Sequence, residues 1–355
     1  MGNSFSSSTN VQTWRCADRR MGGARMQGRR GGMEDFDVHV AGFVNPAWDL
    51  LVVLDGHGGS SVAARVASRL PEVLAMHLKP DDSVEAIQKA MDRAFEQVDT
   101  ELLATEEPTR DCSGACCSLA LVTPSHFIIA FCGDCVGFLL RVASDGLRMT
   151  NLLGWDHEPS LPEERARIEA AGSRVHLDGI MPRVDGDLNV SRAFGDAFWK
   201  TETRRAPPRF VDGCFVDQPP ITGLSHKTFP ITAAPDFCVV PRAASDVMLV
   251  LGSDGLVDFG MTTDKFRVVD RLWQAVQLEG MSDATALATL AVDTAYLNHS
   301  SDNITALVWL AELPEPWRNP RAAEEWVAYM KGRNARLRGP DTEEPDPFPA
   351  EHAEV

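Results

Sequence analysis

Three aspartates in this 355-residue sequence stand beside short apolar runs. Asp55 and Asp254 come at or just after the ends of two such runs, and Asp302 stands just before a third. The runs cover residues 50–54, 247–251 and 304–310. Continuous apolar runs of this length are typical of buried strands. We therefore expect three strand ends to bring carboxylates to one place.

Carboxylates gathered in this way favour a site for hard divalent cations, which take oxygen ligands. Crowded carboxylates repel each other unless a metal supplies the compensating charge. Two metal ions held by them could bridge a water molecule, lower its pKa and direct it at phosphorus. An Asp-Gly pair alone is a common turn, so the prediction of a metal centre depends on the three aspartates meeting.

The elements that must position these aspartates follow from the spacing of apolar residues. Further strands are expected at 117–122, 127–131 and 136–140, joined by short turns into a β-meander. Four-residue apolar spacing predicts helices from residue 62 to 74 and from 84 to 102, and further helices are expected at 162–171 and 285–297. Strands and helices come in clusters, which favours an α+β sandwich of antiparallel sheets covered by helices.

Charge and hydropathy narrow the possible functions. The formal net charge of −17 repels phosphate backbones and argues against nucleic-acid binding as a function. The apolar runs are too short to span a bilayer. Positive charge is concentrated in residues 1–30, which carry six arginines against Asp18.

The N-terminal residues match the pattern for myristoylation of Gly2, and no apolar region of a secretory signal follows. One acyl chain anchors weakly, so the neighbouring arginines or acylation of Cys16 would supply a second signal. We expect a cytoplasmic protein associated with the inner leaflet of a membrane. The alternative is a disordered, serine-rich leader.

The eight cysteines lack the regular spacing of a secreted disulfide framework. Cys132 and Cys135 form a C-x-x-C pattern that could be redox-active or bind zinc together with Cys112 and Cys116. Free cysteines also pack as small apolar residues on buried strands, and this interpretation is favoured.

In motif content and motif order, the sequence resembles the metal-dependent (type 2C) protein serine/threonine phosphatase family over about residues 20–310. The matching stretches are Met26-Gln27-Gly28-Arg29-Arg30-Gly31-Gly32-Met33-Glu34-Asp35, Asp55-Gly56-His57-Gly58-Gly59, Cys132-Gly133-Asp134, Asn189-Val190-Ser191-Arg192-Ala193-Phe194-Gly195-Asp196, Ser253-Asp254-Gly255-Leu256-Val257-Asp258 and Asp302-Asn303-Ile304-Thr305. One motif would be weak evidence, whereas six in order are strong.

The resemblance implies a four-layer sandwich, in which two central antiparallel sheets are flanked by helices, with two Mn²⁺ or Mg²⁺ ions in a cleft at one end. Asp55 would bridge the ions. The other implied ligands are the carbonyl of Gly56, the carboxylates of Asp254 and Asp302, and Glu34 and Asp35 acting directly or through water. Asp134 would hold a weaker third cation.

The same resemblance assigns Arg30 to the substrate phosphate and His57 to general-acid catalysis. A planar guanidinium can grip two phosphate oxygens, and Arg30 stands four residues before the metal ligand Glu34. A histidine can protonate the leaving serine or threonine oxygen near neutral pH. The alternative for His57 is a turn histidine with a structural hydrogen bond.

The expected function is therefore hydrolysis of phosphoserine and phosphothreonine in proteins by direct attack of a metal-bridging water, by a monomer whose partners are phosphoproteins. One alternative is an inactive phosphatase-fold scaffold that recruits partners at a membrane. Another is a two-metal phosphoesterase or nuclease for small molecules or nucleic acid. Four departures from the family pattern affect the turn at Asp134 and the loop over the cleft: Cys116-Cys117, Cys135-Val136, Glu158 and Val257.

Three regions are expected along the chain. Residues 1–19 form a leader, residues 20–312 a catalytic domain, and residues 313–355 a helix that begins near Asn319 and Pro320 and an acidic, disordered tail. Within the catalytic domain, residues 196–235 are rich in Pro, Gly and Arg and are predicted to be a long loop insertion. Its arginines, Arg204, Arg205 and Arg209, would bind acidic or phosphorylated substrates.

Overall fold

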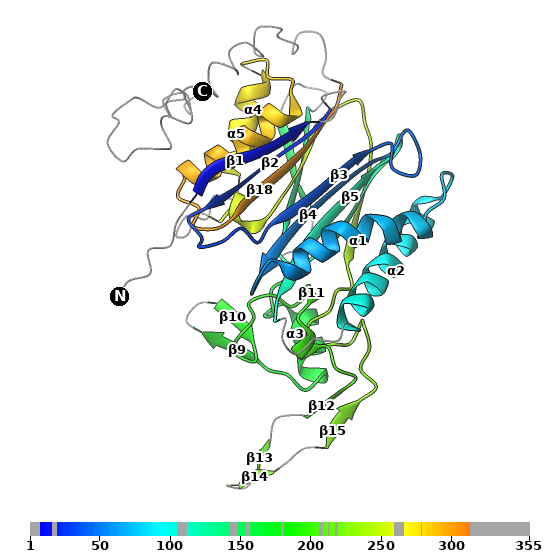
Figure 1. Cartoon of the computed structure of the whole chain (residues 1–355), viewed down its shortest axis with the longest axis vertical. Coiled ribbons are helices and arrows are strands. Elements are labelled where there is room, and N and C mark those ends of the chain that lie inside the picture. Colours follow the sequence, from blue (N-terminus) through cyan, green and yellow to red (C-terminus); the bar gives the residue numbers. More distant parts are fainter. Residues whose placement is uncertain are drawn as a thin grey trace.

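The computed structural model describes residues 8–15, 20–104, 112–142, 148–153, 157–178, 181–205, 209–211, 214–216, 219–258, 266–277 and 279–312. Two antiparallel sheets form the centre of this part of the chain (Figure 1). The first contains, in order, β1 (Ser8–Arg15), β2 (Met21–Gly28), β18 (Ile304–Leu310), β17 (Asp246–Gly252), β7 (Val136–Val142) and β8 (Arg148–Leu153). The second contains β16 (Asp236–Pro241), β6 (His126–Cys132), β5 (Gly114–Val122), β4 (Asp49–His57) and β3 (Phe36–Ala41), and β11 (Phe194–Gly195) pairs with β5.

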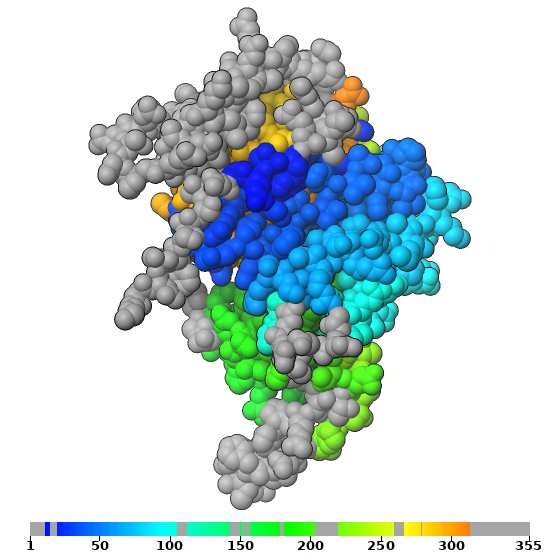
Figure 2. Space-filling model, in the orientation of Figure 1, coloured from blue at the N-terminus to red at the C-terminus, as the bar shows by residue number. Residues whose placement is uncertain are grey.

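Helices cover the outer face of each sheet. The pair α4 (Arg267–Gln277) and α5 (Ala284–Leu297) covers the first sheet, and α1 (Ser61–His77) and α2 (Val84–Leu103) cover the second. In the surface view, α1 and α2 form the lighter blue and cyan area (Figure 2). Four layers result, so the predicted α+β sandwich is confirmed.

Three layers of apolar side chains hold these four layers together. Along β17, Leu249 and Leu251 pack between the two sheets, whereas Met248 and Val250 pack under α4 and α5. Successive side chains of a strand point to opposite faces. Because both faces of the strand are buried, the sequence shows a continuous apolar run instead of an alternating one.

The remaining elements lie beyond the end of the sandwich, in green in Figure 1. They are α3 (Pro162–Ala170), β9 (Val175–Asp178), β10 (Met181–Val184), the 3₁₀ turn η1 (Ala197–Trp199), β12 (Thr203–Arg205), β13 (Arg209–Val211), β14 (Cys214–Val216) and β15 (Pro220–Thr222). The predicted loop insertion 196–235 therefore includes short paired strands, β12 with β15 and β13 with β14.

The predicted β-meander is wrong. Strands β5 and β6 pair with each other, but β7 lies in the other sheet, between β17 and β8. The chain crosses between the sheets at Gly133, whose φ of +105° favours glycine. A Cβ on Gly133 would lie 2.2 Å from the Cys116 sulfur, so the crossing is tight. The crossing places Asp134 between the two sheets.

Strand β1 lies within the predicted leader, residues 1–19, and pairs with β2. Gly2, Cys16 and the predicted C-terminal helix and tail lie outside the described residues. Within the described part of the chain, no helix has the length and apolar character needed to cross a membrane.

The prediction that cysteines pack as small buried residues is confirmed for four of them. Cys116, Cys117, Cys132 and Cys135 are buried free thiols, and burial raises the pKa of each one. Among the residues that the structure describes, no cysteine belongs to a group with metal-binding geometry.

Candidate metal centre

A cavity of about 340 Å³ lies where β4 and β17 end. It is lined by Arg30, Gly31, Gly32, Glu34, Asp55, Gly56, His57, Gly58, Cys116, Asp134, Asn189, Val190, Asp254, Asp302 and Asn303. Most of the predicted site residues therefore meet at one place. Asp35 is absent from this lining. The side chains of the loop arginines, Arg204, Arg205 and Arg209, lie outside the described part of the structure.

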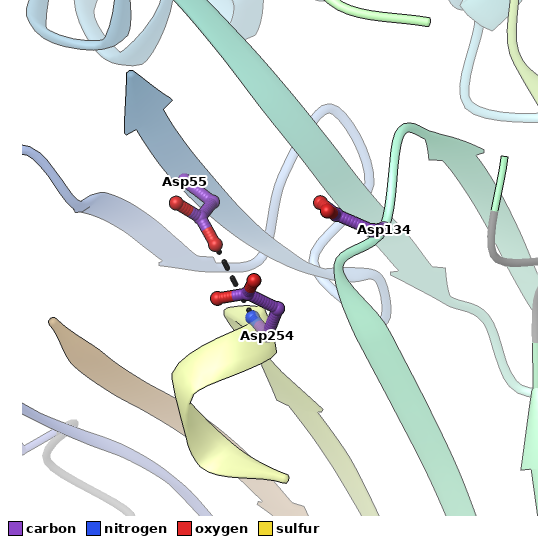
Figure 3. A group of neighbouring side chains, drawn as sticks. All are labelled: Asp55, Asp134 and Asp254. Atoms are coloured by element: carbon purple, nitrogen blue, oxygen red, sulfur yellow. Dashed lines mark hydrogen bonds between the residues drawn. The ribbon is translucent and has the colours of Figure 1, made fainter. Parts of the chain in front are cut away.

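Three carboxylates face one another in the cavity (Figure 3). Asp55 lies near the end of β4, Asp134 in the crossing between β6 and β7, and Asp254 at the start of η2 (Asp254–Leu256), just after β17. One oxygen of each lies within 4.8 Å of the other two. The backbone N–H of Asp254 donates a hydrogen bond to Asp55 Oδ2 at 3.2 Å. The sheets thus deliver carboxylates from both sides of the sandwich to one point.

Burial raises the pKa of Asp55 and of Asp254 well above that of an ordinary aspartate, and the neighbouring carboxylates raise both further. Among the neighbouring carboxylates, Asp254 raises the pKa of Asp55 most, and Asp134 raises the pKa of Asp254 most. A cation among these oxygens would offset the repulsion between the ionised carboxylates. Carboxylate oxygens are also the ligands that Mn²⁺ and Mg²⁺ take. The donor set therefore fits the predicted cofactor.

Glu34 and Gly56 complete one wall of the cavity. A Cβ on Gly56 would lie 2.4 Å from the carbonyl oxygen of Glu34, so glycine allows the segment that carries Glu34 to lie directly against β4. The backbone N–H of Glu34 donates to Asn303 Oδ1 at 2.8 Å.

Asp302 and Arg30 form an ion pair at the cavity. Arg30 Nη2 donates to Asp302 Oδ2, and the N–H of Asn303 donates to Asp302 Oδ1 at 2.7 Å. The Arg30 side chain is 58% exposed, against 21% for Asp302. The predicted phosphate ligand is thus accessible and touches a predicted metal ligand.

Asp35 does not line the cavity, whereas the other predicted metal ligands do. It is buried, and its Oδ2 accepts hydrogen bonds from Ser253 Oγ at 2.8 Å and Thr305 Oγ1 at 2.7 Å. Burial raises the pKa of Asp35 to about 7. Because Ser253 immediately precedes Asp254, these contacts make Asp35 a support for the turn that presents Asp254.

His57 contacts Asp196, an acid for which the sequence predicted no role in the site. His57 Nε2 lies 2.9 Å from Oδ2 of Asp196, which is buried and has a left-handed φ of +51°. Burial alone would lower the pKa of His57, but the charge and hydrogen bond of Asp196 outweigh it, and the pKa is raised. A Cβ on Gly114 would lie 2.3 Å from both His57 Nε2 and Asp196 Oδ2. Asp196 belongs to a matched motif, but nothing in its spacing indicates the partner, 139 positions away.

Comparison with known families decides the classification. A family model described as protein phosphatase 2C matches residues 19–304. The chain belongs to the protein phosphatase 2C family. The resemblance inferred from six motifs is thereby confirmed.

Individual relatives agree with the protein phosphatase 2C assignment. Human "Probable protein phosphatase 1N" is 32% identical over 302 residues, which cover 84% of this chain and 62% of that protein. Rice "Probable protein phosphatase 2C 68" is 30% identical over 315 residues, which cover 82% of this chain and 77% of that protein. This chain thus spans less than two thirds of the human relative's length.

A crystal structure of serine-threonine phosphatase 2C from Toxoplasma gondii resembles the present one with a TM-score of 0.62 and 20% identity, covering 85% of this chain and 95% of that one. At this identity, the likeness supports the protein phosphatase 2C fold.

Proposed function

We propose that this protein is a metal-dependent protein serine/threonine phosphatase that hydrolyses phosphoserine and phosphothreonine. The observation that carries the proposal is the group of mutually repelling carboxylates, Asp55, Asp134 and Asp254, in a cavity that also presents Arg30 and His57. Membership of the protein phosphatase 2C family supports the same activity.

Two Mn²⁺ or Mg²⁺ ions would be held by Asp55, Asp254, Asp302, Glu34 and the carbonyl of Gly56, all of which line the cavity. Asp134 is proposed to hold a weaker third ion. When bound, the metal supplies a water of lowered pKa and neutralises charge that develops on the phosphate oxygens.

The side chains of this protein would bind the substrate and move the proton. Arg30 exchanges its contact with Asp302 for the substrate phosphate, which its planar guanidinium can grip through two oxygens. His57 protonates the leaving serine or threonine oxygen. Asp196 holds Nε2 of the His57 ring, so we assign Nδ1 as the atom that donates the proton to the leaving oxygen.

Turnover of a phosphopeptide with added manganese tests the activity, with a nucleotide monophosphate as the competing substrate. We expect the phosphopeptide to be hydrolysed and the nucleotide to react far more slowly. Metal binding by calorimetry without turnover of either substrate would instead favour the inactive scaffold.

We propose that the loop arginines dock acidic or phosphorylated protein substrates. Their backbone lies in β12 and β13, which project away from the sandwich (Figure 1). Charge reversal at Arg204, Arg205 and Arg209 should raise KM for phosphoproteins and leave KM for a small aryl phosphate unchanged. Equal effects on both substrates would indicate a general folding defect.

Attachment to the inner leaflet of a membrane is a further part of the proposal, and it is supported by the myristoylation pattern at Gly2 and the arginines that follow. Gly2→Ala should release the protein from membranes in cells, because arginines alone give only salt-sensitive attachment. Unchanged fractionation would contradict this part of the proposal.

A further inference from the structure

Arg30 lies on a segment that regular secondary structure does not hold in place. Residues 29–34, called here the Arg30 loop, connect β2 to β3, and residues 29–32 are exposed. Fixing an exposed backbone costs conformational entropy at each residue. Because both Arg30 and Glu34 belong to this loop, other side chains must hold it in the geometry that faces the cavity.

Asn303 bonds two backbone groups of the loop and one of the adjoining strand β2. Its Nδ2 donates to the carbonyl oxygens of Gln27 at 2.7 Å and Gly32 at 2.8 Å, and its Oδ1 accepts from the N–H of Glu34 at 2.8 Å. An asparagine side chain offers two donors and one acceptor group, and all of them are used here. Asn303 is buried, so these bonds are protected from water.

Arg29 holds the start of the loop against α5 and the segment that follows it. Its Nη1 donates to the carbonyl oxygens of Tyr296 at 3.1 Å and Ser300 at 2.5 Å, and its guanidinium carbon lies 4.0 Å from the centre of the Tyr296 ring. Tyr296 is in the last turn of α5. A cation is favoured there by the carbonyl groups at the helix end and by the aromatic face.

We propose that Arg29 and Asn303 are positioning residues for phosphate binding, which act by fixing the Arg30 loop between α5 and the start of β18. Neither side chain needs to touch phosphate. The inference rests on the proposed function in one respect, because it takes Arg30 as the phosphate ligand.

Arg29→Lys is the sharpest test, because lysine keeps the charge but lacks the planar fork that reaches two carbonyls and stacks on the ring. We expect about a tenfold weaker affinity for inorganic phosphate, measured by calorimetry on the magnesium-loaded protein, with the magnesium affinity unchanged. Arg165→Lys is the matched control, since Arg165 makes an exposed ion pair with Glu169 on α3. It should bind phosphate as the wild type does.

A double-mutant cycle separates positioning from general destabilisation. In an Arg30→Ala background, Arg29→Lys should cause no further loss of phosphate affinity, because the residue through which it acts is gone. An equal loss in both backgrounds would overturn the proposal. So would wild-type phosphate affinity in Arg29→Lys alone.

Asn303→Asp tests the other anchor, because it keeps the acceptor for Glu34 but replaces the NH2 group, which donates to two carbonyls, with an oxygen that cannot donate to them. We expect weaker binding of both phosphate and magnesium, since Asn303, unlike Arg29, also bonds the backbone of the proposed metal ligand Glu34 directly. Unchanged affinity for both would exclude Asn303 as an anchor.

The binding measurements do not depend on turnover. A wild-type protein that binds phosphate without hydrolysing a phosphopeptide contradicts the proposed function alone. A wild-type protein that binds no phosphate overturns the inference.

Discussion

Two groups of charged side chains near the end of the sandwich differ in how their charges are balanced. In the metal cavity, Asp55, Asp134 and Asp254 bring three like charges together. In the second group, called here the Glu164 cluster, a buried carboxylate meets two guanidinium groups. Arg192 Nη2 lies 2.6 Å from Glu164 Oε1, and Arg167 Nη1 lies 2.7 Å from Glu164 Oε2.

The pKa values of the acids in the two groups are shifted in opposite directions. Burial and like charges raise the pKa of Asp55 and Asp254. Burial would also raise the pKa of Glu164, but the hydrogen bonds and charges of Arg192 and Arg167 lower it to about 2. A buried charge that is matched within the protein stabilises one conformation, whereas unmatched charges indicate a ligand that completes them. The carboxylates of the metal cavity therefore suit a ligand-binding role, and the Glu164 cluster suits a structural role.

The largest effect should follow from Asp55→Asn, which removes one of the like charges. We expect turnover of a phosphopeptide to fall by about a thousandfold or more and manganese binding to be lost, because Asp55 supplies charge to the ions. The metal-free variant should unfold at a higher temperature than the metal-free wild type, because the repulsion is relieved. Kinetics, calorimetry and thermal unfolding check the three outcomes.

Asp49→Asn provides the matched control on the same strand. Asp49 is buried at the start of β4, and its Oδ2 accepts a hydrogen bond from Trp309 Nε1 at 2.9 Å, which an asparagine oxygen can also accept. This variant should keep its metal and its activity. Near-full activity of Asp55→Asn at saturating manganese would show that the ligand assignment is wrong.

Glu164→Gln should act on stability instead of metal binding. It leaves Arg167 and Arg192 without their carboxylate, and breaking a buried ion pair costs about 3–5 kcal/mol. Urea unfolding should show a loss of this size, while the manganese affinity of the folded variant stays close to that of the wild type. A loss of metal affinity at unchanged stability would reverse the roles assigned to the two groups.

The Glu164 cluster also predicts acid sensitivity. The pKa of Glu164 is lowered from 4.5 to about 2. The contribution of the ionised Glu164 to the free energy of unfolding is therefore fully present above pH 4.5 and is lost as the pH falls towards 2. The difference in unfolding free energy between wild type and Glu164→Gln should therefore shrink over this range by about 3 kcal/mol. A difference that is constant from pH 6 to 2.5 would contradict the lowered pKa.

The sequence predicted the layers and most of the residues that meet at the cavity because both depend on local patterns. Apolar runs buried on both faces identify β4, β17 and β18, and the aspartates adjoin these runs. The crossing at Gly133 could not be predicted in this way, since a two-residue turn also suits a hairpin. Strand β7 pairs instead with β17, about a hundred residues further along the chain, and with β8.

Asp35 and Asp196 show the same limit in the site. Asp35 adjoins Glu34 in a motif, yet its side chain is buried against Ser253 and Thr305. Asp196 reaches His57 only because β11 pairs with the end of β5. Contacts made by the packing of distant strands leave no periodic signal in the sequence, so a motif indicates a residue's neighbourhood before it indicates its contacts.

The smallest effect is expected at Asp134, the third member of the like-charged group. The turn that carries it has Cys135 and Val136 where the family pattern has hydrogen-bonding residues, but the structure supplies another support. The N–H of Gly133 donates to His157 Nδ1 at 3.0 Å, and His157 Nε2 lies 3.1 Å from Asp236. This support orients the turn, and well-supported carboxylates bind metal more tightly.

Asp134→Ala should therefore lower kcat about tenfold while two tightly bound ions remain, since Asp55 and Asp254 keep their places. Asp134→Asn, which keeps the shape and removes the charge, should match the alanine variant if the carboxylate serves a cation. Manganese titrations by calorimetry, with kinetics at each metal concentration, distinguish this pattern from the joint loss of metal and rate expected for Asp55→Asn. Full activity of Asp134→Ala at every manganese concentration would mean that catalysis needs only two of the three carboxylates, and the group would then be a two-aspartate site with Asp134 as a neighbour.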